Sequence, residues 1–311
     1  MVLLSHTTLI AAAETAYPGL PTRIQNPLLQ SYFIPVNPVT SSEAWTLSHA
    51  LYITNTYQQA QQGQDLVIID VENTRYDLQL THRRDDWLYN LNLSLISNRP
   101  GALDQTIEKW HDIFGLPQSG RDTVTHDQIL LYYQAQNTVI VDSQSSSEGL
   151  GDIQLAVGYQ LDHNSQLWFA LELPSNDDSL LISNRGVDTA LWYSSSRRTT
   201  DNSLVYGTLG LALPANHGLL KNHLRQQVLF AQLGMRYAYS ADYQLILQAD
   251  LNSAIADSDL DAMGDAFQAQ FGLRLLNLFE NHQLDLFFSE DVIPGYAPDI
   301  TFALRLSPRP D

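Results

Sequence analysis

The feature that most constrains this chain is an alternation of apolar and polar side chains, repeated about a dozen times between Glu43 and Pro308. In the stretch 243–252, YQLILQADLN, one parity is Tyr, Leu, Leu, Ala and Leu, and the other includes Gln, Gln, Asp and Asn. Successive side chains of a strand point to opposite faces, so each such segment has one apolar and one polar face. Strands of about ten residues with this pattern, joined by polar turns, predict a transmembrane β-barrel.

The alternation predicts twelve membrane strands, an even number as expected for a single-chain bacterial barrel. We expect them at 43–55, 74–84, 87–98, 149–161, 165–174, 186–196, 203–213, 225–239, 242–254, 264–276, 282–290 and 298–307. The expected fold is therefore all-β, an antiparallel up-and-down barrel. The links between the segments alternate between short and long, which places both termini on the periplasmic side and the long loops outside.

Composition excludes several classes of protein. No apolar run approaches the roughly 18–20 residues that a membrane helix needs. The chain has no cysteine, which rules out disulfides, thiolate metal sites and cysteine nucleophiles. Its formal net charge of −18, from 34 acidic and 16 basic residues, argues against nucleic-acid binding. The acidic excess indicates either a solvated surface or outer loops that face divalent cations.

The N-terminal part precedes the periodic segments and divides into two. Residues 1–16 contain a short apolar stretch and an Ala cluster at 11–13, as in part of a secretory signal peptide. Residues 17–42 carry five spaced prolines, which remove ladder donors and predict an extended lead-in on the periplasmic side or in the lumen. The barrel itself is expected to occupy 43–308.

Aromatic residues on the apolar parity gather near the short-turn ends of the strands. Amphipathic rings settle at the depth of the lipid headgroups, so this clustering predicts an interfacial girdle. Its members are Trp45, Trp87, Tyr89, Tyr193, Tyr237, Tyr239 and Tyr243.

The long loops contain further predicted elements. The segments 65–71, 128–135 and 137–142 have the composition of short hairpin strands that extend above the membrane. Between them, apolar residues at helical spacing, followed by Gly115 and Pro117, predict a short amphipathic helix in a long extracellular loop. The residues of this loop helix are Leu103, Ile107, Trp110 and Phe114.

Several short motifs are distributed over most of the chain: NPLL at 26–29, WHDIFGLP at 110–117, GLGD at 149–152 and APDITF at 297–302. With these motifs the chain resembles a Gram-negative outer-membrane β-barrel family known as domain of unknown function 3187. The resemblance implies a barrel in the bacterial outer membrane, in contact with outer-membrane lipid and lipopolysaccharide. It implies no activity, cofactor or protein partner.

Charged residues of both signs fall on the polar parity and are expected to line the lumen. They are Asp77, Arg83, Glu172, Arg236, Asp250, Arg274, Asp285 and Arg305. Twelve strands enclose more space than the eight that side chains alone can fill, and less than a sixteen-stranded porin. The leading hypothesis is a narrow channel or uptake pore for small polar solutes. The alternative is a non-conducting structural, assembly or docking protein of the outer membrane.

A lipid-modifying enzyme is the least favoured reading. His49 lies on the apolar parity, but we find no serine placed to act with it, and G-x-S-x-G is absent. Asp257, Asp259 and Asp261 resemble a calcium loop, but Ala262 and Gln268 stand where such a loop needs Gly and Glu. The sequence therefore predicts no catalytic residue, no cofactor and no metal site beyond loose binding of divalent cations.

Overall fold

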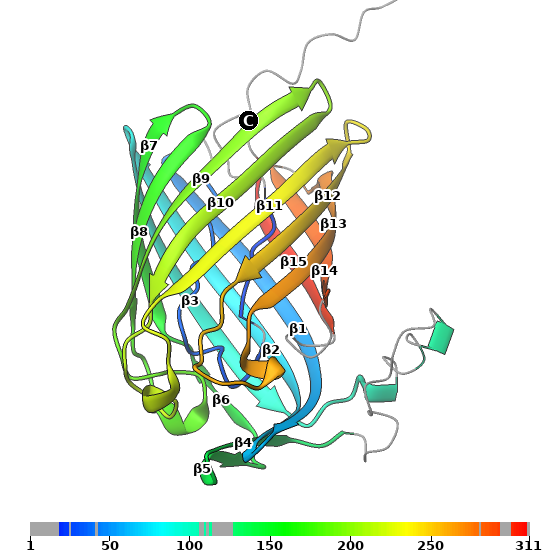
Figure 1. Ribbon diagram of the computed structural model, residues 1–311. Coiled ribbons are helices and arrows are strands. Elements are labelled where there is room, and N and C mark those ends of the chain that lie inside the picture. Colours follow the sequence, from blue (N-terminus) through cyan, green and yellow to red (C-terminus); the bar gives the residue numbers. More distant parts are fainter. Residues whose placement is uncertain are drawn as a thin grey trace, which may run out of the picture.

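In the part of the chain that the structure describes, fifteen antiparallel strands form one sheet, and twelve of them close into a barrel (Figure 1). This computed structural model describes residues 19–24, 26–40, 43–105, 109, 112–113, 127–279, 281–292 and 300–309. The barrel strands are β1 (Trp45–Gln62), β2 (Asp65–Arg84), β3 (Trp87–Arg99), β7 (Ile153–Asp162), β8 (Ser165–Leu173), β9 (Asp188–Thr200), β10 (Ser203–Leu213), β11 (Val228–Ala238), β12 (Tyr243–Asn252), β13 (Ala266–Phe279), β14 (His282–Asp291) and β15 (Ile300–Pro308). The predicted twelve-stranded antiparallel barrel is confirmed.

The ring closes where the first barrel strand meets the last. β1 pairs with β15 in one uninterrupted register, from His49 opposite Leu306 to Asn55 opposite Ile300. Every other barrel strand pairs with its neighbours along the chain, and β3 and β7 become neighbours across the longest loop. A closed ring leaves no strand edge unpaired, so the backbone polar groups of the wall are satisfied within the sheet.

Burial along the strands is the reverse of that in a water-soluble protein. On β12, the inward side chains Gln248 and Asp250 are 4% and 5% exposed, whereas the outward Leu245 and Leu247 are 48% and 47% exposed. Twelve strands joined in this way have an apolar outer surface and a polar interior. This arrangement suits a barrel whose outer face contacts hydrocarbon.

The two ends of the barrel differ in the length of their links. At the short-turn end, defined by the links at 85–86, 163–164, 201–202, 239–242 and 280–281, strands are joined by tight turns. At the long-loop end lie the β1–β2 hairpin, the links at 174–187, 214–227 and 253–265, and the described residues of the link at 100–152; β14 ends and β15 begins at this end as well. The short-turn end is at the top of Figure 1.

Two strands continue well past the expected boundaries. β1 runs to Gln62 and β2 begins at Asp65, so most of the predicted loop 56–73 is a hairpin of paired strands. The alternation of apolar and polar residues weakens in 56–62, TYQQAQQ. This part of the β1–β2 hairpin lies beyond the apolar band of the barrel, so it does not need an apolar outer face. The predicted outer hairpin strands are present: β4 (Leu130–Ala135) pairs with the first part of β2, and β5 (Thr138–Ser143) pairs with β4.

The predicted strand 149–161 is interrupted in the structure. It is divided into β6 (Ser147–Leu150) and β7, with Gly151 and Asp152 between them. Both pieces pair with β3, and the Gly151 N–H donates to the Ser94 carbonyl across the break. The ring is therefore continuous at this point although the ladder is irregular.

Among the described residues, helical structure is confined to short segments of the loops. The three-residue 3-10 helices η2 (Asp178–Leu180), η3 (Lys221–His223) and η4 (Asp261–Met263) lie at the long-loop end. Of the predicted loop helix, Leu103 immediately precedes two helical residues, while Ile107, Trp110 and Phe114 lie outside the described residues. In the part of the chain that is described, no helix combines the length and apolar character that a bilayer crossing requires.

Large aromatic side chains on the inner wall lie over glycines of the neighbouring strand. A Cβ placed on Gly158 would lie 2.7 Å from the indole of Trp168. A Cβ on Gly210 would lie 2.2 Å from the ring of Phe230, and one on Gly234 would lie 2.2 Å from that of Tyr206. These glycines let the rings lie flat against the wall, which narrows the lumen without distorting the strands.

We predict that Gly158→Val destabilises the barrel by about 1–3 kcal/mol, because the new side chain collides with a fully buried indole. Denaturant titration of the detergent-solubilised protein, followed by heat-modifiable gel mobility, measures the change. Adding Trp168→Ala removes the collision, so the double variant should lose less stability than the two single changes together. Simple additivity would contradict the proposed contact.

Candidate functional site

The lumen is occupied by the N-terminal segment 19–40, which we call the plug; Gln25 within it lies outside the described residues. It is visible in Figure 1 as the dark-blue trace inside the barrel. Its prolines, including Pro21, Pro27, Pro35 and Pro38, prevent it from joining the wall as a strand. Its buried apolar side chains are Leu20, Leu28, Leu29, Tyr32, Phe33, Ile34, Val36 and Val39.

The plug enters and leaves the lumen at the same end. Gly19 lies near the short-turn end, where its carbonyl accepts a hydrogen bond from Arg305. The chain reaches the long-loop end at Asn26, which donates to the carbonyl of Ala262. It then returns, and the Val39 N–H donates to Gln79 shortly before β1 begins at Trp45.

Side chains of the wall satisfy backbone groups of the plug. The Leu20 N–H donates to the Gln248 amide oxygen at 2.8 Å, and the Gln248 amide nitrogen returns a bond to the Leu20 carbonyl at 3.1 Å. The Phe33 N–H donates to Asp188 at 3.2 Å, and the Val39 N–H to Gln79 at 2.8 Å. Buried backbone groups need partners, and here amides and carboxylates take the place of a second strand.

A buried ionic network ties the plug to one side of the wall. The Arg23 guanidinium of the plug lies 2.6 Å from the Asp77 carboxylate on β2. Arg75 of the same strand approaches the other oxygen of Asp77 at 2.8 Å, and Ser94 donates to that oxygen at 2.6 Å. Arg23 also donates to Gln154, whose amide nitrogen donates to Glu172 at 2.8 Å. Each charge in the network is desolvated but has close partners of opposite sign or polarity.

A second network on the opposite strands gathers amides around one carboxylate. Thr22 of the plug donates to Asp250 at 2.6 Å. Gln232 of β11 donates to the same oxygen at 2.8 Å, and Gln270 of β13 to the other at 2.6 Å. The carboxylate is therefore held by neutral donors from the plug and from both flanking strands.

A third network lies nearer the short-turn end. Asp285 on β14 accepts hydrogen bonds from Arg274 at 2.7 and 3.1 Å and from Arg305 at 2.9 and 2.6 Å. These are bidentate pairs, in which both guanidinium groups present two N–H donors to one carboxylate. Arg305 also reaches the plug, where it donates to the Gly19 carbonyl at 2.8 Å.

The long-loop end is sealed by apolar side chains. Leu28, Leu29, Tyr32 and Phe33 of the plug belong to one cluster with residues of β2, β4 and the loops around η3 and η4. In this seal the rings of Tyr133 and His223 meet edge to face with centroids 6.2 Å apart. Burial raises the pKa of the Tyr133 phenol, as expected where the seal excludes water.

All eight predicted lumen residues lie on the inward parity of their strands. Six are buried and take part in the networks above: Asp77, Glu172, Asp250, Arg274, Asp285 and Arg305. Arg83 and Arg236 are partly buried near the short-turn end. Two arginines of the networks were not predicted. Arg23 lies in the segment expected as a periplasmic or luminal lead-in, to which no contacts were assigned. Arg75 lies on the same parity of β2 as Asp77, and that parity could have identified it.

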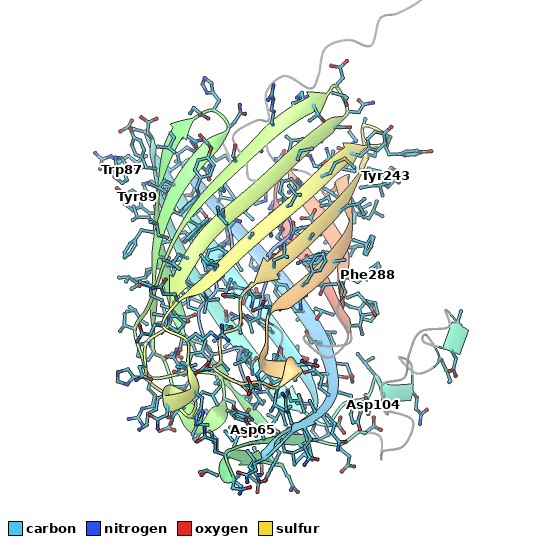
Figure 2. The ribbon with its side chains drawn as sticks, viewed as in Figure 1. Asp65, Trp87, Tyr89, Asp104, Tyr243 and Phe288 are labelled. Atoms are coloured by element: carbon cyan, nitrogen blue, oxygen red, sulfur yellow. The ribbon has the colours of Figure 1, made fainter. Side chains whose placement is uncertain are left out.

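The seven predicted girdle residues are all exposed on the outer surface. Their exposures run from 40% at Tyr237 to 75% at Tyr239, high values for such large rings. Trp87, Tyr89 and Tyr243 project outward near the short-turn end in Figure 2. Trp45 stacks on His82 with ring centroids 4.1 Å apart, and Tyr89 lies on the other side of that imidazole at 6.3 Å.

His49 has a partner on the outer surface. One ring nitrogen lies 2.6 Å from the Tyr76 hydroxyl of the neighbouring strand, and the register of β1 is regular at this point. A cross-strand hydrogen bond therefore explains how an imidazole is accommodated among leucines. Across the described residues, no group of three or more His, Asp or Glu side chains is arranged to hold a metal ion.

A family model matches this chain over residues 5–309. The chain belongs to the family described as protein of unknown function (DUF3187). The expected family is therefore confirmed. No protein of curated function matches this DUF3187 chain in sequence.

Several solved structures resemble this chain over most of their length. An outer membrane channel from Pseudomonas putida F1 is 14% identical to this DUF3187 protein, with a TM-score of 0.56, over 89% of this chain and 97% of the other. The Pseudomonas putida toluene transporter TodX is 9% identical, with a TM-score of 0.46, over 96% and 97%. The Ralstonia pickettii toluene transporter TbuX is 9% identical, with a TM-score of 0.44, over 87% and 90%. The first likeness shows a shared barrel fold.

We predict that loss of the Arg23–Asp77 contact loosens the plug. The chain has no native cysteine, so a single Leu28→Cys change reports on the plug without background. In the folded barrel this site should resist maleimide, because Leu28 is 2% exposed. Adding Arg23→Gln should speed labelling about tenfold, the factor expected if plug retention weakens by about 1.4 kcal/mol.

Arg225→Gln is the matched control for this experiment, because Arg225 is a surface residue at the long-loop end. It removes the same charge without touching the plug and should leave the labelling rate unchanged. Equal labelling in the Arg23→Gln variant and the control would show that this ion pair does not retain the plug.

Proposed function

We propose that this DUF3187 protein is an outer-membrane channel for small polar solutes, with a lumen closed by its removable plug. The observation that carries the proposal is that the carboxylates of the three networks have partners on the wall in addition to those in the plug. Asp77 forms an ion pair with Arg75, and Asp285 forms ion pairs with two arginines of the wall. Asp250 accepts hydrogen bonds from Gln232 and Gln270 of the wall. Withdrawal of the plug therefore leaves no wall carboxylate of these networks without a partner, and the barrel can stay folded while it opens.

Polar solutes suit the chemistry of the interior. The inner wall presents buried amides, hydroxyls and paired charges at several depths; the amides include Asn90, Asn92, Gln154, Gln166 and Gln268. Once the plug is withdrawn, these groups offer donors and acceptors to a hydrated solute along the path. The apolar seal at the long-loop end is partly made by the plug itself, so its withdrawal also opens that end.

The location proposed is the bacterial outer membrane, with the short-turn end facing the periplasm. The exposed apolar band, the aromatic side chains at the short-turn end and the likeness to an outer membrane channel support this location. Outer-membrane lipid and lipopolysaccharide would then contact the outer face. Divalent cations that bridge lipopolysaccharide could be attracted by acidic loop residues such as Asp257 and Asp259.

A second candidate function is a non-conducting docking protein. The observation that favours it is the sheet formed by β1, β2, β4 and β5 beyond the barrel, in which β5 is the last strand. An unpaired strand edge can accept a strand from a partner. In this alternative the plug would be permanent and the sheet extension would be the functional part.

An enzymatic role is not proposed. In the described structure Nδ1 of His49 hydrogen-bonds with the Tyr76 hydroxyl, which is a tyrosine partner and not a serine nucleophile. The known activities of the three compared structures, as their names give them, are those of channels and transporters.

We predict that deletion of residues 17–40 converts a closed barrel into a conducting one. Single-channel recording in planar bilayers should show rare, brief openings for the full-length protein and sustained steps for the deletion variant. Heat-modifiable gel mobility, measured on the same preparation, establishes that the variant is folded. A folded deletion variant that does not conduct would favour the docking alternative.

A second prediction concerns location. After fractionation of cells that produce the full chain, the protein should be recovered with the outer membrane, and unheated samples should migrate faster than boiled ones. Barrels resist detergent until heated because their wall is closed by hydrogen bonds. A freely soluble species with heat-insensitive mobility would contradict both the proposed location and the proposed channel.

A further inference from the structure

Charge is unevenly distributed along the inner wall. The inward-facing charged residues near the short-turn end are Arg83, Arg198, Arg236, Arg274 and Arg305, with Asp285 as the carboxylate among them. Toward mid-depth and the long-loop end the carboxylates Asp77, Glu172 and Asp250 predominate. The protein as a whole carries a formal charge of −18, so a cationic vestibule at one end is the opposite of its average surface.

Arg236 is a cation of this vestibule for which the described structure shows no direct ion-pair or hydrogen-bond partner, although Asp285 attracts it from a distance. The nearby Asp285 already accepts four hydrogen bonds from Arg274 and Arg305. The other charged groups that act electrostatically on Arg236 include Arg274 and Arg198, which repel it. Among the described residues, none forms an ion pair or hydrogen bond with its guanidinium. A partly buried cation without a partner is costly, and an anion from solution would relieve that cost.

The surroundings of Arg236 are apolar. Leu204 of β10 and Ile246 of β12 lie directly opposite it in the two flanking registers, and all three point inward. Side chains opposed in this way are close neighbours on one face of a sheet. Leu204 and Ile246 are buried in a cluster that also contains Tyr206 and Leu20 of the plug.

A second polar group faces the same region. Gln244 lies on the inward parity of β12, two positions from Ile246, and is opposite Arg274 in the next register. Its buried amide oxygen has no hydrogen-bond partner in the described structure. Because an amide oxygen only accepts hydrogen bonds, it is available to an N–H or O–H donor of a ligand and not to a ligand's carboxylate.

We propose that this vestibule is a binding site for small organic anions, in which Arg236 pairs with a carboxylate at the edge of the apolar cluster that contains Leu204 and Ile246. The inference rests on the proposed channel and names a solute class for it. A guanidinium beside an apolar wall selects ligands that carry both a negative charge and an apolar body. A ligand with only one of these would leave either the guanidinium or the apolar side chains without a partner. Arg236 lies near the end of β11, so such a ligand reaches it from the short-turn end.

The test is equilibrium binding to the full-length protein in detergent, measured by titration calorimetry. Benzoate is the probe, and benzamide is a neutral ligand of nearly the same shape. Benzoate should bind at least about tenfold more tightly than benzamide, since a charge-assisted hydrogen bond contributes about that factor or more. Sulfate, an anion without an apolar body, should bind more weakly than benzoate.

Three variants localise the site. Arg236→Gln should weaken benzoate binding about tenfold and leave benzamide binding unchanged. Arg236→Lys keeps the charge and should retain part of the affinity, which a purely structural role would not explain. Arg225→Gln removes an arginine at the opposite end and should behave as the parent. Heat-modifiable mobility confirms that each variant is folded before titration.

Equal affinity for benzoate and benzamide, undiminished benzoate binding by Arg236→Gln, or tighter binding of sulfate than of benzoate would each overturn the proposal. Because the titration needs no conduction, it is separate from the bilayer experiment. A conducting deletion variant whose parent does not bind benzoate would refute the anion site and leave the channel standing. A parent that binds benzoate, with a folded but non-conducting deletion variant, would support the site and refute the channel.

Discussion

The pairing of β1 with β15 is the interaction on which the rest of the structure depends. Once the sheet is closed, the wall has no edge, and its backbone donors and acceptors are satisfied without water. The outer surface can then be almost wholly apolar, and polar side chains have only the interior to occupy. The buried charges, the amides of the wall and the position of the plug in the lumen all follow from this division between an apolar outer surface and a polar interior.

The interior solves a problem that closure creates. When protein fills a lumen lined with amides and charges, each of these buried groups needs a hydrogen-bond or ion-pair partner. The plug meets this need with a backbone that is kept out of the ladder by proline and satisfied by Gln79, Gln248 and Asp188. Because the carboxylates of the three networks also have partners on the wall, the plug is bound firmly without being indispensable to the barrel.

Much of the barrel could be predicted from the sequence, because parity is a local property. The outward leucines and the inward Asp250 and Arg274 follow from counting by twos along each strand. The plug could not be located in this way: Arg23 meets Asp77 and Thr22 meets Asp250 through tertiary contacts that no local period encodes. The extension of β1 to Gln62 was not predicted. There the pairing of β1 with β2 continues beyond the apolar band, and the sequence no longer alternates between apolar and polar residues.

One signal in the sequence went unused. Gly158 and Gly210 fall on inward positions where a neighbouring strand supplies Trp168 or Phe230. A glycine on the polar parity of a membrane strand, opposite an aromatic residue on the same parity, indicates a ring lying along the wall. Reading such pairs would have predicted a lumen narrower than twelve strands alone suggest.

The route of the plug has a topological consequence for assembly. Because residues 19 and 39 both lie toward the short-turn end, the segment between them is a doubled-back strap and not a thread passed through the ring. A strap of this kind can be inserted after the cylinder has formed, and drawn out again, with no free chain end passing through the cylinder. Folding of the wall and filling of its interior can therefore be separate events, and the second can be reversed while the first persists.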